Sequence, residues 1–165
     1  MKTITIFRAA NHTALALVMM ICVVSSAVAD VFPAGVACPD FDVRLEASGS
    51  PVGFSGDGSR GHGLVFAGTG IIYTFTNLST GTTWSPATSP AAAGAAQKVR
   101  PNADGSLTVT ITGSTGLIMF PTDYPAGPST TWYTGKLVIE VDAAFNTTLK
   151  SFAGRQTDIC AELSD

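Results

Sequence analysis

Residues 117–142 read LIMFPTDYPAGPSTTWYTGKLVIEVD, and this stretch holds the clearest strand and loop signals of the chain. The apolar runs at 117–120 and 137–141 are typical of buried strands. Between them lies a proline-rich loop at 121–131, which leads directly into two aromatic residues. A stiff loop between two firm strands is a common location for binding residues. We therefore predict a contact surface made of Asp123, Tyr124, Trp132 and Tyr133.

Outside this stretch, short β-like segments alternate with turns. Residues 41–47 alternate apolar and charged side chains, which indicates a strand with one buried face. Residues 106–112 alternate in the same way, and a turn is expected at 113–116. Loops are expected at 48–63 and 86–94, where Gly, Ser, Pro and Ala dominate. Further strands are expected at 64–67, 70–77, 82–85, 97–100 and 147–153, with one or two helical turns at 157–163.

The number and spacing of these strands predict an all-β fold without a long helix. Short connections between consecutive strands favour a single antiparallel meander of about eight strands. Such a meander can close as a small barrel or pack as a β-sandwich. We favour the barrel, because closure removes the exposed edges of a sheet.

The N-terminal residues are typical of a secretory signal peptide. A short basic start precedes an apolar run at 13–24, and a small-x-small motif follows at 27–29. An uncleaved membrane anchor is the alternative, but a membrane span needs about 20 apolar residues and this run is shorter. We predict a cleaved signal peptide at 1–29 and a single secreted, extracellular domain at 30–165.

Cleavage would change the charge of the chain. It would remove Lys2 and Arg8 but none of the 12 acidic residues. Nine basic residues less these two leaves seven, so the net charge would become −5 instead of −3. Basic residues scattered singly along an acidic chain fit nucleic acid and anionic membranes poorly. We expect no nucleic-acid partner and no stable membrane insertion after signal cleavage.

The cysteines predict a covalent link between the two ends of the domain. Cys22 would leave with the signal peptide, so only Cys38 and Cys160 would remain. Two cysteines in an oxidising compartment are expected to pair. Two free buried thiols are the alternative. A redox role is disfavoured because the chain has no Cys-x-x-Cys motif.

Four motifs resemble those of small secreted bacterial proteins that are common in actinobacteria. They are Ala37-Cys38-Pro39-x-Phe41, Phe75-Thr76-Asn77-Leu78-x-Thr80-Gly81, Phe120-Pro121-Thr122-Asp123-x-Pro125-x-Gly127-Pro128 and Thr157-Asp158-Ile159-Cys160. Together they span most of the mature chain, and the proline loop is the most specific of them. The resemblance implies export, an all-β domain and the disulfide. It carries over no catalytic residue, because these proteins have no assigned activity.

Catalytic and metal-binding patterns are weak. His62 is the only histidine of the mature chain, and it could form a hydrolase-like triad with Asp57 or Asp123 and a serine. However, no Gly-x-Ser-x-Gly motif presents a nucleophile, and no Walker-type loop is present. The pairs Asp40/Asp42 and Glu140/Asp142 could offer oxygens to Ca²⁺, but a solvated strand face is the favoured explanation. We predict no metal site and no cofactor.

The sequence therefore favours a secreted, disulfide-closed β-domain that binds a partner without catalysis. Residues 121–133 would form its contact surface, because exposed aromatic rings can stack on sugars or on apolar side chains of a protein. The first alternative is a small β-barrel that carries an apolar ligand. The second is a secreted hydrolase that uses Asp123 or His62. The expected partner is thus a protein, a glycan or a small apolar ligand.

Overall fold

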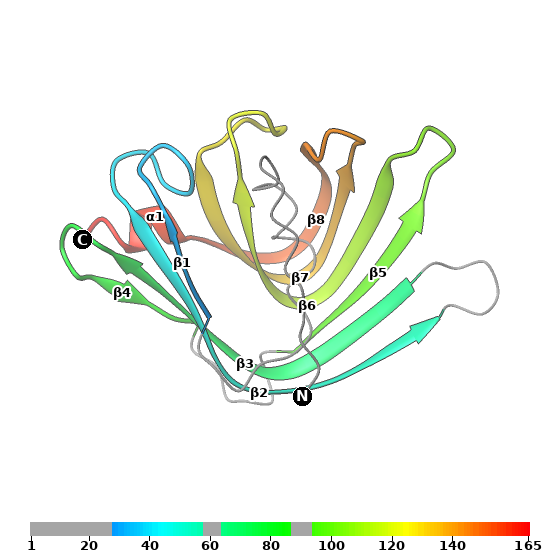
Figure 1. The fold of residues 1–165 in the computed structure, drawn as a ribbon, viewed down its shortest axis with the longest axis horizontal. Helices are drawn as coiled ribbons and strands as arrows, with labels where there is room; N and C mark the ends of the chain where they lie inside the picture. The colour runs from blue at the N-terminus through cyan, green and yellow to red at the C-terminus, as the bar shows by residue number, and fades with distance from the viewer. Residues whose placement is uncertain (1–27, 58–63, 87–93) are drawn as a thin grey trace, which may run out of the picture.

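The computed structural model describes residues 28–57, 64–86 and 94–165, with the backbone alone at 28, 49–57 and 64–70. Residues 1–27 of the predicted signal peptide and His62 lie outside the described residues. The described part contains eight strands and one short helix (Figure 1). They are β1 Val28–Phe32, β2 Val43–Asp57, β3 Leu64–Asn77, β4 Thr83–Trp84, β5 Ala95–Pro101, β6 Leu107–Met119, β7 Ser129–Val141, β8 Thr147–Asp158 and α1 Ile159–Glu162.

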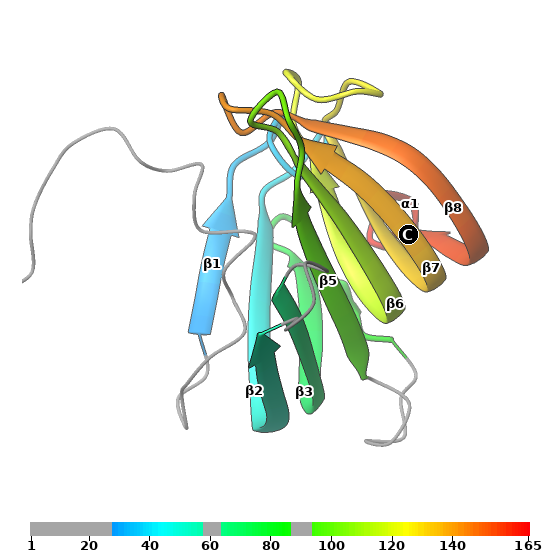
Figure 2. The same cartoon turned by 90° about the vertical axis from the view of Figure 1, so that its right-hand side faces the viewer.

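All strands belong to one antiparallel sheet in the order β1-β2-β3-β5-β6-β7-β8, with β4 paired to the end of β3. β3 pairs with β5 through residues 64–68, so the sheet divides into two halves of four strands, β1–β4 and β5–β8. Within the described residues no pair joins β1 to β8, and Figure 2 places these two strands at opposite edges. The predicted antiparallel all-β fold is confirmed. The favoured barrel closure is wrong, and a sandwich fits the two halves better.

The first apolar cluster packs the two halves against each other. Phe75 from β3 and Trp132 from β7 are both buried in it, together with the first residues of α1. The rings of Tyr73 and Trp132 have centroids 5.8 Å apart, and those of Trp84 and Trp132 are 5.9 Å apart. Tilted rings at these separations pack favourably beyond their buried area. Aromatic side chains therefore fill the space between the halves.

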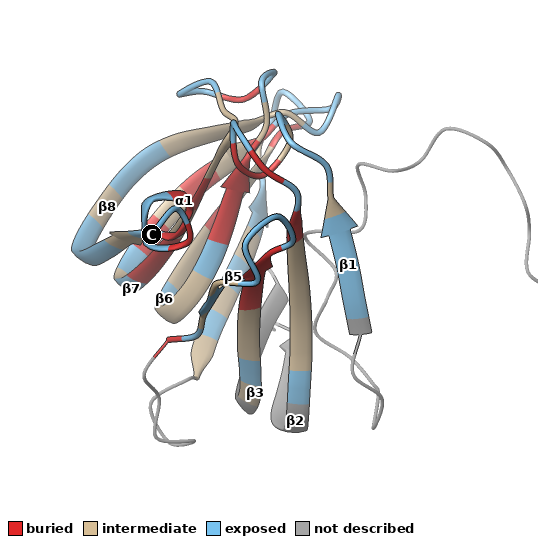
Figure 3. Ribbon diagram, turned by 90° about the vertical axis from the view of Figure 1, so that its left-hand side faces the viewer, coloured by how far each residue is buried: buried red, intermediate tan, exposed pale blue. Residues whose placement is uncertain are grey.

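The second apolar cluster lies on the opposite face of β6 and β7. Alternate residues of a strand point to opposite faces, so Leu117 and Tyr133 belong to this cluster while Ile118 and Trp132 belong to the first. The ring of Tyr133 meets that of Phe152 edge-on, with centroids 4.7 Å apart. Figure 3 shows the resulting pattern, in which buried residues concentrate on β6 and β7 while β1 and much of β8 are exposed.

A row of small residues lets the long strands bend. Across the sheet, consecutive register partners are Gly53, Gly68, Ala95, Gly113, Gly135 and Gly154. Three of them have φ angles of +115°, +142° and +141°, which L side chains rarely adopt. Figure 1 shows the strands curving through their centres, as expected where glycines turn a corner in a sheet. We call these six residues the glycine row.

The connection between β1 and β2, residues 33–42, is joined to helix α1 at one side of the first cluster. Cys38 and Cys160 form a disulfide that spans 122 residues of sequence, as predicted. The Thr130 hydroxyl donates a buried hydrogen bond of 2.8 Å to the carbonyl oxygen of Ala37. The amide of Asn77 donates a 3.0 Å hydrogen bond to the carbonyl oxygen of Leu163. The two ends of the domain are thus joined covalently and by buried polar contacts.

Several local predictions need correction. Residues 48–57 were expected to be a loop, but they extend β2. The turn expected at 113–116 is absent, because β6 runs through it as one strand that bends at Gly113. Strand β7 begins at Ser129, inside the predicted loop at 121–131. Glycine is typical of a chain reversal, but at 49–56 and at Gly113 it lies within a continuous strand. The helical turn predicted within 157–163 is confirmed by α1.

Candidate functional site

Four connections gather at one end of the molecule, at the top of Figures 1 and 2. The connection 120–128 precedes β7 in the sequence, and the connection 142–146 follows it. They meet because β7 and β8 bend at the glycine row. We call residues 33–42, 102–106, 120–128 and 142–146 the loop end. These segments contain five aspartates and no Lys or Arg, so the loop end is acidic.

Asp123 joins two of these connections. Its side chain is only 6% exposed. One carboxylate oxygen accepts a 2.6 Å hydrogen bond from the Phe120 N–H, and the other accepts a 2.6 Å hydrogen bond from the Thr147 N–H. Because both oxygens are occupied by backbone donors, Asp123 fastens the loop to β8. A carboxylate held in this way is not presented to a partner or a substrate.

Replacing Asp123 with alanine should destabilise the domain by about 2 kcal/mol, because two backbone N–H groups would lose a charged acceptor in a part-buried site. Urea denaturation followed by tryptophan fluorescence measures this loss. Asp40 is exposed on the same end, so Asp40→Ala should change stability by less than about 0.5 kcal/mol. Equal effects of the two variants would contradict the fastening role.

The four residues predicted as a contact surface are not presented together. Trp132 and Tyr133 are each 5% exposed, and alternation sends their rings into the two different apolar clusters. Burial raises the pKa of the Tyr133 phenol above its ordinary value, an effect partly offset by a hydrogen bond with Thr131. Both rings serve packing. Only Tyr124, which is 72% exposed, reaches solvent from this set.

Tyr124 is exposed but its backbone is fixed. Its N–H donates to the Thr147 carbonyl oxygen, and its own carbonyl oxygen accepts from the Leu149 N–H, both at 2.8 Å. These two bonds add Tyr124 to the edge of β8 as an isolated parallel bridge. Thr148, the partner of Tyr124 in this bridge, lies three residues after Phe145, which is 50% exposed. Two large aromatic side chains therefore stand exposed on neighbouring backbone segments.

Phe145 was not predicted from the sequence. It occupies the β7–β8 turn with φ at +65°, which is unusual for a residue other than glycine. The turn is held by Asp142, whose Oδ1 accepts hydrogen bonds from the N–H groups of Ala144 and Asn146 at 2.8 and 2.9 Å. A large apolar residue within Asp-Ala-Ala-Phe-Asn is the signal that could have identified it. We call Tyr124 and Phe145 the aromatic pair.

Phe145→Gly should stabilise the domain by about 1 kcal/mol, because glycine adopts a positive φ without strain and the half-exposed ring contributes little burial. Phe145→Ala is the matched control, since alanine also loses the ring but keeps the strained backbone. Urea midpoints of the two variants separate these effects. A gain with alanine equal to the gain with glycine would rule out relief of backbone strain.

Hydrogen bonds lower the pKa of two aspartates at the loop end. Bonds from the side chain and backbone of Ser106 hold the pKa of Asp104 below its ordinary value of 3.8. Bonds from the side chain and backbone of Asn146, and from Ala144, do the same for Asp142. Both carboxylates are exposed and ionised at neutral pH. They keep the loop end negative.

These shifts predict a loss of stability in acid. The unfolded chain binds a proton at each aspartate more tightly than the folded chain does, so protonation favours unfolding. The contribution of Asp104 and Asp142 is complete above pH 3.8 and is lost as the pH falls through their lower folded values. Urea midpoints between pH 5 and pH 2.5 should fall less steeply for Asp104→Asn/Asp142→Asn than for the unchanged chain. Parallel curves would contradict the assignment.

The described residues gather no group of three or more His, Cys, Asp and Glu side chains that could hold a metal ion. Of the calcium candidates, Asp42 accepts a 2.8 Å hydrogen bond from the Ala34 N–H, and Glu140 lies 3.6 Å from the Lys150 ammonium.

In the part of the chain that is described, no helix is long and apolar enough to cross a membrane. Comparison with family models, with curated proteins and with solved structures found no match to this chain.

Proposed function

We propose that this chain is a secreted, disulfide-closed binding domain without catalysis of its own, and that the aromatic pair is the centre of its contact surface. The observation that carries the proposal is the exposure of Tyr124 and Phe145 on neighbouring backbone segments that are fixed by hydrogen bonds. Buried aromatic anchors supply much of the energy of protein interfaces. Rings that are exposed in the free domain are available for that burial.

The backbone around the pair supports this function. Asp123 and the Tyr124 bridge hold one segment against β8, and Asp142 holds the other. A fixed surface loses little conformational entropy when it binds. Phe145 is also retained in a strained conformation, and such strain is found preferentially at functional sites.

The chemistry of the loop end favours a protein partner with an apolar site bordered by basic residues. Rings on protruding turns insert into a groove more readily than they form a flat platform for a sugar. Asp104 and Asp142 give the loop end negative charge, which a partner's Lys and Arg residues would complement. Asp123, one of the two carboxylates considered for catalysis, is the less suited to it because both its oxygens accept backbone hydrogen bonds. The apolar-ligand alternative would require space where the rings of the first cluster pack.

Site-specific crosslinking tests the proposal. A photoreactive phenylalanine analogue replaces Tyr124 in one protein and Leu78 in another, because Leu78 is an apolar residue, 42% exposed, outside the loop end. Each protein is irradiated with the native culture supernatant and cell-surface fraction. We expect a discrete crosslinked product from position 124 alone, and its loss when Phe145→Ser is added.

Two results would overturn the proposal. One is equal crosslinking from positions 124 and 78, which would mean that the aromatic pair is not a specific surface. The other is an undiminished product after Phe145→Ser in a variant with an unchanged circular dichroism spectrum. A glycan array run in parallel decides the class of partner: binding there that disappears with Tyr124→Ser would replace the protein partner with a glycan.

A further inference from the structure

Basic residues that are scattered along the sequence come together on one face of the sheet. Strand register places Lys98 beside Thr110, Thr112 beside Lys136, and Thr134 beside Arg155. Register partners point to the same face of a sheet. This side of β5–β8 is turned away from the second apolar cluster, and nearer α1 the same side carries Ile118 and Trp132 into the first cluster. We call the part of it that holds the cationic residues the basic face. Its cationic residues are Lys98, Arg100, Lys136, Lys150 and Arg155.

The basic face carries a clear excess of positive charge. All five of its cationic residues are exposed. Its one acidic side chain among the described strand residues is Glu140, which lies 3.6 Å from the Lys150 ammonium. Five positive charges and one negative charge leave a net charge of +4 on this face, in a chain whose net charge is −3. The positive charge is therefore concentrated on this face.

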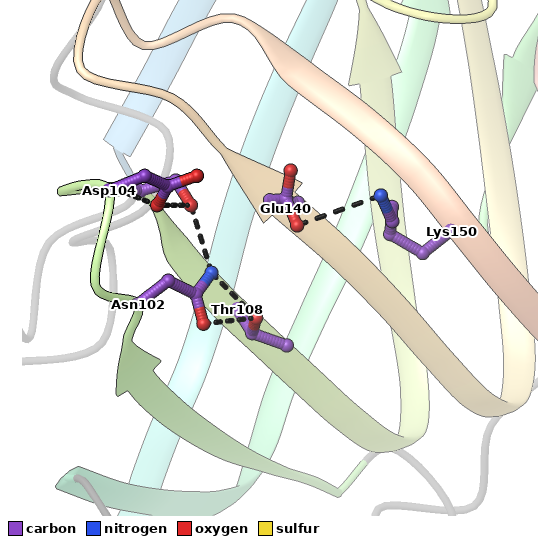
Figure 4. A network of polar contacts seen from close by, with 6 residues as sticks. Asn102, Asp104, Thr108, Glu140 and Lys150 are labelled. Atoms are coloured by element: carbon purple, nitrogen blue, oxygen red, sulfur yellow. Dashed lines mark hydrogen bonds and ion pairs between the residues drawn. The ribbon is translucent and has the colours of Figure 1, made fainter.

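Hydroxyl groups occupy the positions between the cations. Thr108, Thr110 and Thr112 follow one another along β6 on this face, and Thr148 and Ser151 lie on β8. Figure 4 shows the upper part of the face, where Asn102 exchanges hydrogen bonds of 3.0 and 3.1 Å with the Thr108 hydroxyl beside the Glu140–Lys150 pair. On this side of the described strands β5–β8 the one aromatic side chain is Trp132, which is 5% exposed within the first apolar cluster, so no ring is presented between the cations.

We propose that the basic face binds a linear anionic polysaccharide. Adjacent strands lie about 4.8 Å apart and alternate residues of a strand about 7 Å apart, so the cations form a lattice with spacings of about 7 to 12 Å. A polymer with carboxylate groups at regular intervals can meet several of them at once. The threonine hydroxyls can both donate to and accept from sugar hydroxyls.

The same composition disfavours the other polyanions. Single-stranded nucleic acid is held by base stacking on exposed aromatic rings, and Trp132, the one ring on this side of the described strands β5–β8, is buried. An anionic membrane is bound by basic residues together with inserted apolar side chains, whereas Ile118 and Trp132 on this side of the described strands are buried in the first cluster. The surface is separate from the aromatic pair, so the inference does not depend on the function proposed above.

The test measures binding to polygalacturonate, with neutral dextran as the comparison polymer, by retention on the immobilised polymers at 20, 150 and 500 mM NaCl. We expect retention on polygalacturonate alone, which weakens as salt rises. The double variant Lys98→Gln/Lys136→Gln should bind about tenfold more weakly at 20 mM NaCl. Lys98→Arg/Lys136→Arg keeps both charges and should bind like the unchanged protein.

A control variant separates the face from net charge. Arg44→Gln/Ser79→Asp makes the same change in net charge on the β1–β4 half, where both residues lie away from the basic face. It should bind polygalacturonate normally. Equal weakening by the control, or no retention of the unchanged protein at 20 mM NaCl, would overturn the inference. Tighter binding to a 20-nucleotide single-stranded DNA or to phosphatidylglycerol vesicles at equal charge would also overturn the polysaccharide assignment.

Discussion

Gly135→Ala is expected to destabilise the domain by about 3 kcal/mol or more and to prevent folding if the margin is small. Gly135 has a φ of +142°, and a Cβ added there would overlap the carbonyl oxygen of Ala153 and lie 2.9 Å from the Cα of Gly154. These atoms are backbone of the neighbouring strand β8, so they cannot move aside without breaking the ladder. The loss is measured by urea denaturation, or by the yield of soluble protein if the variant does not fold.

Gly81→Ala separates the two causes of this effect. Gly81 also has a positive φ, of +80°, but an added Cβ would have nothing within 4 Å. This control should therefore lose only about 1 kcal/mol, the energy of a strained backbone. If Gly135→Ala lost no more than Gly81→Ala, close packing at the glycine row would not be what forms the bend.

The strands themselves are largely predictable from alternation. Residues 107–112 and 137–141 alternate in a way that is typical of strands, and the structure places both in strands. The pairing of Cys38 with Cys160 could also be predicted, because no other cysteine competes once Cys22 is assigned to the predicted signal peptide. These features depend on local pattern or on a simple count, which a sequence contains in full.

The bends of the strands at the glycine row could not be predicted from local sequence pattern. Gly113 looks like a turn because glycine favours turns, and only its alignment with Gly135 and Gly154 across three strands shows a corner in a sheet. The predicted barrel failed for a related reason. A meander pattern gives the order of the strands but not whether the last strand returns to the first.

The predicted contact surface shows the same limit. Tyr124, Trp132 and Tyr133 are close in sequence, yet two of these rings belong to opposite apolar clusters. The basic residues show the converse. Lys98 and Arg155 are distant in sequence, which suggests scattered charge, but strand register places them on one face. Side-chain direction and strand register decide which residues share a surface, and both are properties of the assembled sheet.

Removing the disulfide should have the second large effect. In Cys38→Ala/Cys160→Ala, the chain loses a link that closes 122 residues of sequence, and such a loss costs about 2 to 5 kcal/mol. The effect should be concentrated at the C-terminus. α1 has only four residues, too few to be stable alone, and it is held by Cys160 and by the burial of Ile159 and Leu163.

Hydrogen exchange and denaturation together test this expectation. Amides of residues 159–163 should exchange faster in the double variant, and the urea midpoint should fall to that of the unchanged protein reduced with dithiothreitol. Asn77→Ala is the control, since it removes the hydrogen bond to the Leu163 carbonyl oxygen but leaves the disulfide intact. It should lose about 1 kcal/mol. A double variant no less stable than Asn77→Ala would mean that apolar packing, and not the covalent link, holds α1 in place.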